Sequence, residues 1–320
     1  MRPKHYLFRT LALIAVGMMC TLNVSAYENR SGMIGDINHD GSLNITDITM
    51  LIHDLITDSE VNSLTDINTD YRLSIGDVTA LIDMVLDESH YSPRFWVNGV
   101  TFSMVRVDGG TFTLGAVQGQ NSEAYYDEYP AHEVTLSDYY IGQYEVQQIL
   151  WCYVMGSLPD GNDDQECPVV NVSWEDCQLF ISTLNELTGC TFRLPTEAEW
   201  EFAARGGNYS KNYKYSGSND YDEVAWCEEN SNDWLHRSGE KKANELGIYD
   251  MSGNAWEWCY DWWGLYDSVA VVDPTGPESG SERVCRGGCM DGHARFCRIG
   301  YRMSYPPETR RSELGFRLAL

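Results

Sequence analysis

Two stretches near the N-terminus place apolar residues at the three- and four-residue spacing of an amphipathic helix. The first carries Ile48, Leu51, Ile52 and Leu55, and the second carries Val78, Leu81, Ile82 and Val85. Residues with this spacing lie on one face of a helix. Because the second stretch repeats the first after 30 residues, the sequence predicts two helices that bury their apolar faces against each other.

A polar loop precedes each stretch, and both loops carry oxygen-bearing side chains at positions 1, 3, 5, 9 and 12. This is the spacing at which an EF-hand-type loop directs its ligands toward one calcium ion. The side-chain candidates are Asp36, Asn38, Asp40, Asn44 and Asp47, then Asp66, Asn68, Asp70, Ser74 and Asp77, with Ser42 and Arg72 offering backbone carbonyls. The alternative is a polar spacer with incidental aspartates.

The two loops differ at position 6, where the backbone turns sharply. Gly41 suits this turn, whereas Tyr71 must adopt a costlier backbone there. The second site is therefore predicted to be the weaker one. A pair of loop-helix units that end on aspartate resembles the dockerin domain over residues 33–88. The resemblance implies a small α-helical calcium module, folded by calcium, that docks onto a cohesin-like protein.

The pattern after residue 101 is that of a mixed α and β domain. The stretch from Phe102 predicts two strands around the Gly109-Gly110 turn, and Val134 begins another strand that leads into a helix. That helix is predicted to turn Val146, Ile149, Leu150 and Tyr153 inward. Residues 208–244 are rich in small polar residues and predict long irregular loops, which Trp226 and Trp234 are expected to anchor.

Two capping boxes predict the starts of further helices. Ser173 pairs with Asp176, and Thr196 pairs with Glu199. The first helix is predicted to bury Cys177, Phe180, Ile181 and Leu184 and to end at Gly189, and the second to bury Trp200 with Phe202 or Ala203 and to end at Gly206-Gly207.

Three sequence blocks follow one another in this domain: RLPTEAEWEFAARGG from Arg193, GIYDMSGNAWEWC from Gly247, and GFRLAL at the end. Together they resemble the formylglycine-generating-enzyme family, the sulfatase-modifying-factor domain, over residues 102–320. The resemblance implies an α+β fold that is related to C-type lectins and rich in irregular loops. Residues 89–101 are expected to be a linker between this domain and the N-terminal module.

The oxidases of this family use two cysteines with four residues between them, which hold a copper ion. Here Cys297 takes the place of the second cysteine, Gly292 falls where the first should be, and Cys289 replaces a serine, so Cys289 and Cys297 have seven residues between them. Thiolates suit copper(I). An oxidase site would still form if the folded loop brought Cys285, Cys289 and Cys297 together. Otherwise the domain is expected to be non-catalytic.

The family resemblance also implies a calcium site in the second block. By position, Asp250 and Glu257 would supply side chains, and Gly253 and Ala255 would supply backbone carbonyls. Such hard oxygen ligands suit calcium. In the alternative interpretation, Asp250 caps a turn and Glu257 pairs with a buried arginine.

The last 38 residues reverse the local charge, with eight arginines and no lysine against three acidic residues. Arg286, Arg298, Arg302 and Arg317 lie in family patterns and are expected to hold loops and carboxylates together. Three other arginines and several of their neighbours are candidates for binding a protein or glycan: Met290, Asp291, His293, Arg295, Phe296, Tyr301, Met303, Tyr305, Arg310 and Arg311. An ordinary solvated loop is the alternative.

Residues 1–26 predict a signal peptide, since basic residues precede an apolar run from Leu11 to Met19 and a small-residue cleavage site ends at Ala26. Met19 is too large for a lipoprotein site at Cys20, so simple secretion is favoured. No later segment is predicted to span a membrane.

Removal of the signal peptide takes the formal charge from -26 to about -29 and leaves nine of the ten cysteines. So acidic a chain disfavours nucleic acid as a partner. Because the number of cysteines is odd, at least one thiol is expected to be free or paired between chains.

Three functions follow from these features. The favoured one is a secreted binding protein, tethered by its calcium module. The alternatives are an oxidase that generates formylglycine in sulfatases and a structural component of a surface complex.

Overall fold

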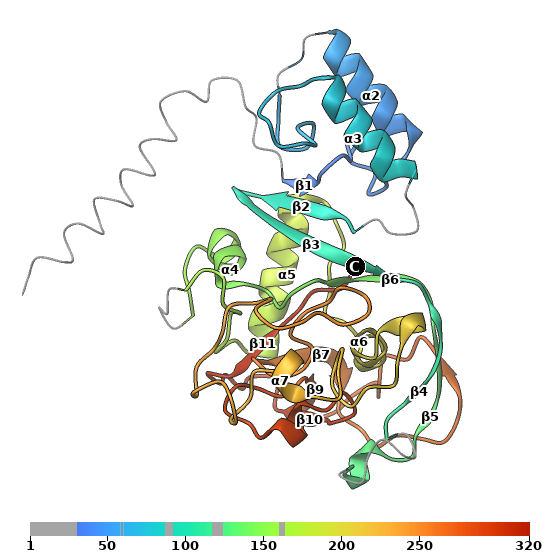
Figure 1. The fold of residues 1–320 in the computed structure, drawn as a ribbon, viewed down its shortest axis with the longest axis vertical. Coiled ribbons are helices and arrows are strands. Elements are labelled where there is room, and N and C mark those ends of the chain that lie inside the picture. Colours follow the sequence, from blue (N-terminus) through green and yellow to red (C-terminus); the bar gives the residue numbers. More distant parts are fainter. Residues whose placement is uncertain (1–30, 58, 60, 87–91, 117–123, 160–163) are drawn as a thin grey trace, which may run out of the picture.

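A computed structural model describes residues 31–57, 59, 61–86, 92–116, 124–159 and 164–320. In Figure 1, a small helical unit stands at one end of a larger mixed α and β domain. The expected signal peptide, with Cys20, lies outside these residues. Within them, no helix combines the length and the apolar character that crossing a bilayer requires.

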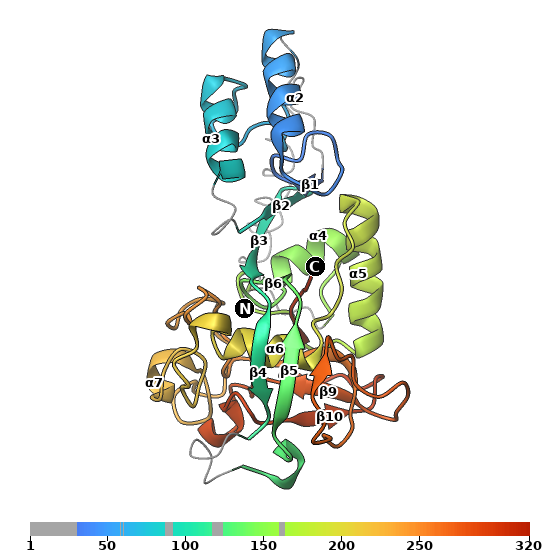
Figure 2. The same cartoon turned by 90° about the vertical axis from the view of Figure 1, so that its right-hand side faces the viewer.

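The helical unit consists of α2 (Ile45–Ile56) and α3 (Ile75–Leu86), which lie side by side in Figures 1 and 2. Leu51 and Leu81 are fully buried between them, together with Ile48 and Val78. Ile52 remains 39% exposed, at the edge of the apolar face. The prediction of two packed amphipathic helices is confirmed.

One four-stranded sheet joins the helical unit to the large domain. Its order is β1 (Gly32–Met33), β2 (Arg94–Val97), β3 (Val100–Val107) and β6 (Tyr139–Gly142), and all neighbours are antiparallel. The linker expected at residues 89–101 is therefore part of this sheet from Arg94 onward. The reason is its alternating pattern, which buries Phe95 and Val97 completely.

Two further sheets complete the large domain. One has the order β10 (Met303–Tyr305), β9 (Arg283–Arg286), β7 (Trp256–Trp262) and β11 (Leu314–Phe316), and the other the order β4 (Gly110–Leu114), β5 (His132–Leu136) and β8 (Val271–Val272). The strands predicted on either side of Gly109-Gly110 are present. However, they join different sheets, since β3 pairs with β6 and β4 pairs with β5.

The main helices of the large domain are α4 (Gln148–Met155), α5 (Trp174–Thr188) and α6 (Glu197–Ala204), with a single turn at α7 (Tyr221–Val224). Both predicted capping boxes are present, at Ser173 and at Thr196, and the predicted inner residues of α5 and α6 are buried. On α4 the prediction fails for Tyr153, which is 50% exposed. Trp151 is buried instead, because its ring stacks on Phe180 of α5 at 5.2 Å between centroids.

Residues 208–244 are largely irregular, as predicted, with short turns at η2 (Gly207–Tyr209) and α7. Trp226 anchors this tract, since its ring stacks on His236 at 3.6 Å and has the Lys241 ammonium 4.0 Å above it. Trp234 does not serve as an anchor, because it is 73% exposed.

The chain ends inside the large domain. Leu320 exchanges two backbone hydrogen bonds with Tyr140, and Ala319 exchanges two with Arg193. Phe316 and Arg317 are fully buried. The GFRLAL block is therefore part of the core.

Candidate ligand-binding loops and metal sites

Two loops that are far apart in sequence pack against each other beside the C-terminal sheet. The loop from Ala225 to Ser231 donates the Glu228 N–H to the Gly292 carbonyl (2.9 Å) and the Ser231 hydroxyl to the Met290 carbonyl (2.5 Å). In return, the N–H of Ala294, at the start of η3 (Ala294–Cys297), donates to the Glu229 carboxylate at 2.9 Å. These bonds hold the cysteine-bearing segment in one conformation.

The cysteine candidates separate into two environments. Cys285 and Cys289 belong to the core that packs around α5, and the Cys289 thiol donates to the Asp291 carboxylate at 3.0 Å. Cys297 instead lies in a small buried cluster with Cys227, whose thiol donates to the Asn230 side-chain oxygen at 3.7 Å. The structure thus does not unite Cys285, Cys289 and Cys297 in one group. Sequence reasoning missed Cys227, because a single chain gives no signal for contact across 70 residues.

The thiols of Cys289 and Cys297 are held in their protonated form. The hydrogen bond with Cys227 and burial raise the pKa of Cys297 well above its usual range. Burial and the neighbouring Asp291 raise the pKa of Cys289 in the same direction. The thiolate is the nucleophile and the metal ligand, so neither side chain is activated at neutral pH in this state.

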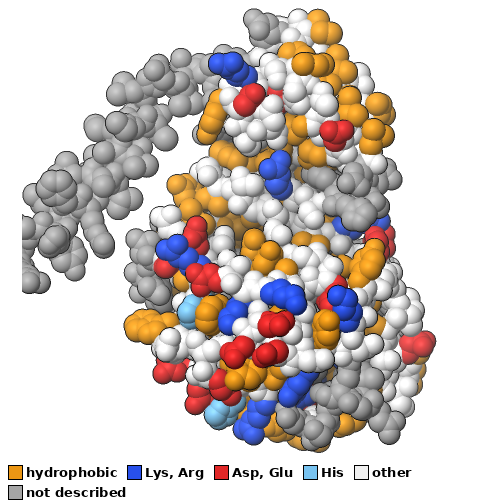
Figure 3. Space-filling model, viewed as in Figure 1, with side chains coloured by type: hydrophobic (Ala, Val, Ile, Leu, Met, Phe, Trp, Pro, Cys, Tyr) orange, Lys and Arg blue, Asp and Glu red, His pale blue; other side chains and the backbone are white. Residues whose placement is uncertain are grey.

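The outer side of the same segment presents charged and aromatic residues. Asp291, His293 and Arg295 are exposed, and Phe296 and Tyr301 are half-buried. The Arg295 guanidinium lies 4.6 Å above the Phe296 ring, which is 5.0 Å from the Tyr301 ring. These five residues are called the C-terminal face below. On the side of the molecule in Figure 3, acidic, basic and hydrophobic side chains are interspersed over the large domain.

The other candidates for this surface have different surroundings. Met290 is only 8% exposed, and Tyr305 is half-buried on β10 with Met303. Arg310 binds both carboxylate oxygens of Asp176 at 2.7 and 2.8 Å, beside the N-terminus of α5. Arg311 pairs with Glu313. These contacts explain Arg310 and Arg311 without a ligand.

The arginines assigned to the scaffold are buried and ion-paired, as expected. Each meets a buried glutamate: Arg286 with Glu201, Arg298 with Glu128, Arg302 with Glu197 and Arg317 with Glu257. Their planar guanidinium groups also donate to loop carbonyls, such as Arg302 to those of Asp127 and Gly264. They therefore fix the irregular loops to the core.

The candidate calcium residues of the second block lie in a buried acidic cluster. Glu257 accepts two hydrogen bonds from Arg317, as in the alternative interpretation, and Asp250 accepts the Gly239 N–H at 2.7 Å. Glu145, which sequence reasoning missed, joins them, and burial raises its pKa well above the usual range and that of Asp250 to about 6. Three buried carboxylates thus share the one arginine of this cluster.

The two N-terminal loops form corresponding hydrogen bonds. Asp36 accepts the N–H groups of Asp40 and Gly41 (3.1 and 2.9 Å), and Asp66 accepts those of Asp70 and Tyr71 (3.0 and 2.9 Å). Burial and neighbouring carboxylates raise the pKa of both aspartates. At position 12, Asp47 and Asp77 accept backbone N–H groups from positions 3 and 9 of their own loops.

The backbones of these loops match as well. Position 6 has a φ of 81° at Gly41 and of 61° at Tyr71, so the costlier backbone predicted for Tyr71 is present. Over the described ranges, no group of three or more His, Cys, Asp or Glu side chains is arranged to hold a metal ion.

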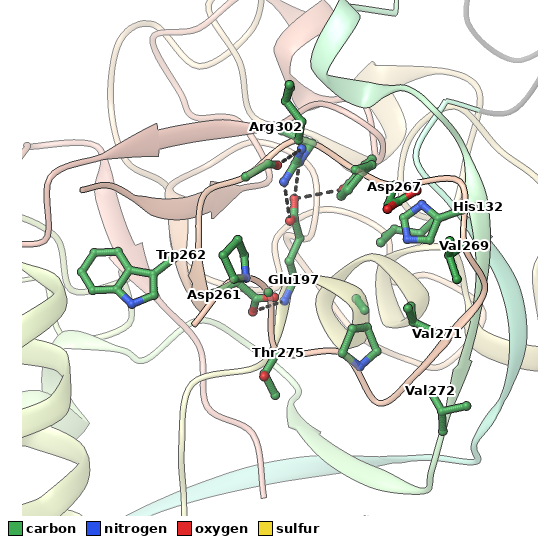
Figure 4. Close-up of a pocket in the computed structure, with 18 residues that line it drawn as sticks. His132, Glu197, Asp261, Trp262, Asp267, Val269, Val271, Val272, Thr275 and Arg302 are labelled. Carbon is green, nitrogen blue, oxygen red and sulfur yellow. Dashed lines mark hydrogen bonds and ion pairs between the residues drawn. The ribbon is translucent and has the colours of Figure 1, made fainter. Parts of the chain in front are cut away.

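A pocket of about 420 Å³ lies between the start of α6 and the loop that follows β7. Figure 4 shows Asp261, Glu197 and Arg302 on one side of it and Val269, Val271 and Val272 on another. Burial and the charge of Glu197 raise the pKa of Asp261 to about 8. Sequence reasoning missed this pocket, because its walls come from segments that are far apart in the chain.

Residues 98–320 match the family of sulfatase-modifying factor enzyme 1-like domains. The chain belongs to this family, which confirms the resemblance drawn from the three blocks. The helical unit lies outside the matched range.

Several known proteins are similar to this chain. The chaperone protein LppX of Paenibacillus barcinonensis is 34% identical over 253 residues, covering 63% of this chain and 83% of the relative. The formylglycine-generating enzyme of Thermomonospora curvata is 28% identical over 304 residues, covering 71% and 96%. Among solved structures, Treponema denticola variable protein 1 gives a TM-score of 0.64 with 34% identity, covering 71% of this chain and 98% of that one. PvdO from Pseudomonas aeruginosa gives 0.57 with 26% identity, covering 68% and 93%.

Proposed function

We propose that the chain is a secreted or cell-surface protein whose large domain is non-catalytic and binds a protein or glycan through the C-terminal face. The observation that carries this proposal is the environment of Cys297. Its expected cysteine partner is replaced by Gly292, and its own thiol is completely buried against Cys227. An oxidase that acts on a cysteine of another protein needs a thiol that the substrate can reach.

The composition of the C-terminal face supports binding. Arginine and aromatic side chains are enriched where proteins bind their partners. Arg295 lies over the Phe296 ring, which packs at a tilt against the Tyr301 ring, so little side-chain freedom is lost when a ligand covers them. The similarity to a protein named as a chaperone also supports a role in contacting other macromolecules.

The test has two parts. In the first, the purified protein, supplied with copper(I) and oxygen, is incubated with a sulfatase peptide that contains the target cysteine. We expect no formylglycine by mass spectrometry, and formation of it would overturn the non-catalytic assignment.

In the second part, the protein is screened on glycan and peptide arrays beside the variants Arg295→Ala and Phe296→Ala. We expect at least one ligand whose binding falls about tenfold or more in both variants, the loss typical of a residue at the centre of an interface. The control is Lys211→Ala, an exposed cation outside the face. Equal binding by all four proteins would place the ligand elsewhere.

The contact between Cys227 and Cys297 favours the oxidase as the second candidate. Two adjacent thiols, once deprotonated, are a donor set that suits copper(I). Titration with copper(I) against a competing chelator tests this candidate. Tight one-to-one binding that is lost in both Cys227→Ser and Cys297→Ser would support it, while binding that is absent or insensitive to these substitutions would exclude it.

The two N-terminal loops are proposed to bind calcium and to make the helical unit a dockerin-like tether for a cohesin-like partner. This proposal is supported by the matching backbones of the two loops and by their ten oxygen-bearing side chains. It is also supported by the raised pKa of Asp36 and Asp66, because a cation relieves repulsion among clustered carboxylates. Calorimetric titration of the protein with calcium should include one event for each of the two loops. A protein in which Asp36→Ala and Asp66→Ala are combined should show neither.

Calcium is also proposed at Asp250, Glu257 and the carbonyls of Gly253 and Ala255. Burial raises the pKa of Asp250 and of the neighbouring Glu145, and a bound cation would favour the ionised form of both carboxyl groups, which supports this site. In the protein with both N-terminal loops disabled, a remaining calcium event that disappears with Asp250→Ala would support this site. Its absence would favour the alternative, in which Arg317 alone balances Glu257.

A further inference from the structure

Cys227 and Cys297 stand apart from the other described cysteines because they share one small buried cluster outside the two main cores. Both are completely buried, in a cluster that also contains Tyr215, Val224 and Ala294. Among the neighbours of Cys297, Cys227 raises the pKa of its thiol most. By contrast, the thiols of Cys167, Cys190 and Cys285 make their contacts with backbone carbonyls.

The surrounding loops hold the two sulfur atoms in place. Asn230 accepts the Cys227 N–H at 3.0 Å, and Ser252 donates its hydroxyl to the Cys297 carbonyl at 2.8 Å. The bonds from the Glu228 N–H to the Gly292 carbonyl and from the Ala294 N–H to the Glu229 carboxylate join the same two loops beside the pair. A bond between the sulfur atoms would therefore form between groups that the fold has already brought together.

Close packing fixes the position of the Cys297 sulfur further. A Cβ atom placed on Gly288 would come within 2.6 Å of this sulfur. The thiol therefore lies directly against the backbone of the Gly287-Gly288 turn. Cys289, one residue beyond that turn, has its own hydrogen-bond partner in Asp291.

We propose that Cys227 and Cys297 form a disulfide that links the 225–231 loop to the segment carrying the C-terminal face. The oxidant is a reactive disulfide, such as that of a protein thiol oxidase or of oxidised glutathione. The two thiols lose two electrons and two protons as the sulfur–sulfur bond forms. The oxidant's disulfide accepts them and is reduced to two thiols.

This bond has consequences for the whole domain. It closes a loop of about 70 residues, and a cross-link over such a distance restricts the unfolded chain strongly. It also consumes both thiols, so the oxidised protein cannot hold copper(I) between them. The bond itself does not depend on the proposed ligand-binding role.

Peptide mapping of the full chain tests the proposal. The protein is equilibrated with oxidised glutathione, alkylated with iodoacetamide under denaturing conditions and digested with trypsin without reduction. Trypsin cuts after Arg295 and Arg298, so Cys289 and Cys297 fall on separate peptides. We expect a linked pair of peptides that contain Cys227 and Cys297 and that separate on reduction by dithiothreitol.

Two results would overturn the proposal: alkylation of both cysteines in the glutathione-treated protein, or a link from Cys297 to Cys289. The linked pair should persist in the control Cys152→Ser, which changes a half-exposed cysteine on α4. As a second measurement, dithiothreitol should lower the midpoint of thermal unfolding by about 10 °C in the wild-type protein. The midpoint of Cys297→Ser should not respond to dithiothreitol.

Discussion

Arg317 binds both carboxylate oxygens of Glu257 at 2.6 Å, and Trp200 donates its indole N–H to the same carboxylate at 2.7 Å. All three side chains are completely buried. Each comes from a different one of the three blocks by which the sequence resembles its family. The blocks therefore belong together for a structural reason, since they meet at a single carboxylate in the core.

This arrangement predicts a large loss of stability when Arg317 is removed. Arg317→Met leaves Glu257 buried without its cation and next to Glu145 and Asp250, so the free energy of unfolding should fall by about 3–5 kcal/mol. Chemical denaturation followed by tryptophan fluorescence measures this loss. The matched control is Arg310→Met, which breaks the exposed pair with Asp176 and should cost no more than about 1 kcal/mol. Similar losses in both variants would contradict the central role given to Arg317.

The turn beside Cys297 predicts that alanine destabilises the protein more at Gly288 than at Gly156, although the two glycines have nearly the same φ angle. Gly288 has a φ of 81° and Gly156, at the end of α4, has a φ of 83°. Alanine at either position adopts a left-handed backbone at a cost of about 1–2 kcal/mol. Only at Gly288 would its methyl group also meet the Cys297 sulfur, whereas Gly156 faces open space.

Overpacking of that kind typically costs a further 1–3 kcal/mol or so. Gly288→Ala should therefore lower the free energy of unfolding by more than Gly156→Ala does, as measured by denaturant titration at equal calcium concentration. Equal stability of the two variants would show that Cys297 does not lie close against the Gly288 backbone.

The local elements of this chain were predictable because their signals are local. Each signal depends on a stretch of about fifteen residues or fewer. The capping boxes at Ser173 and Thr196 and the helices α2 and α3 are all present. Errors arose where tertiary contacts decide. Tyr153 is exposed because Trp151 occupies the position against Phe180.

The candidate site was predictable only in part, for the same reason. The sequence identified Cys297 and the residues of the C-terminal face, since they occupy one segment. It missed Cys227 and Glu145, which meet that segment and the Asp250 cluster only after folding. It also missed the pocket at Asp261, whose walls come from separate parts of the chain.

Asp261 predicts a dependence of stability on pH. Burial and then the charge of Glu197 raise its folded-state pKa to about 8, from about 4 in the unfolded chain. Below pH 4 the group is protonated in both states and costs nothing. Between pH 4 and pH 8 unfolding releases its proton, so the free energy of unfolding falls as the pH rises.

Asp261→Asn imitates the protonated carboxyl and retains an oxygen for the Glu197 N–H, which lies 2.8 Å from the Asp261 carboxylate. The variant should match the wild-type protein near pH 4 and exceed it by a growing margin up to pH 8. Thermal unfolding midpoints at a series of pH values give this difference directly. Parallel curves for the two proteins would show that Asp261 does not titrate in this range.

The N-terminal loops predict that a single residue sets the order of their calcium affinities. Tyr71 and Gly41 hold the same left-handed position in their loops, but only glycine adopts it without a steric penalty of about 1–2 kcal/mol. Tyr71→Gly should therefore strengthen the weaker calcium event roughly fivefold or more, because about 1.4 kcal/mol corresponds to a tenfold change. Gly41→Tyr should weaken the stronger event by a similar factor. Calorimetric titration of the two variants beside the wild-type protein measures both effects, and unchanged affinities in both would mean that the position-6 backbone does not control binding.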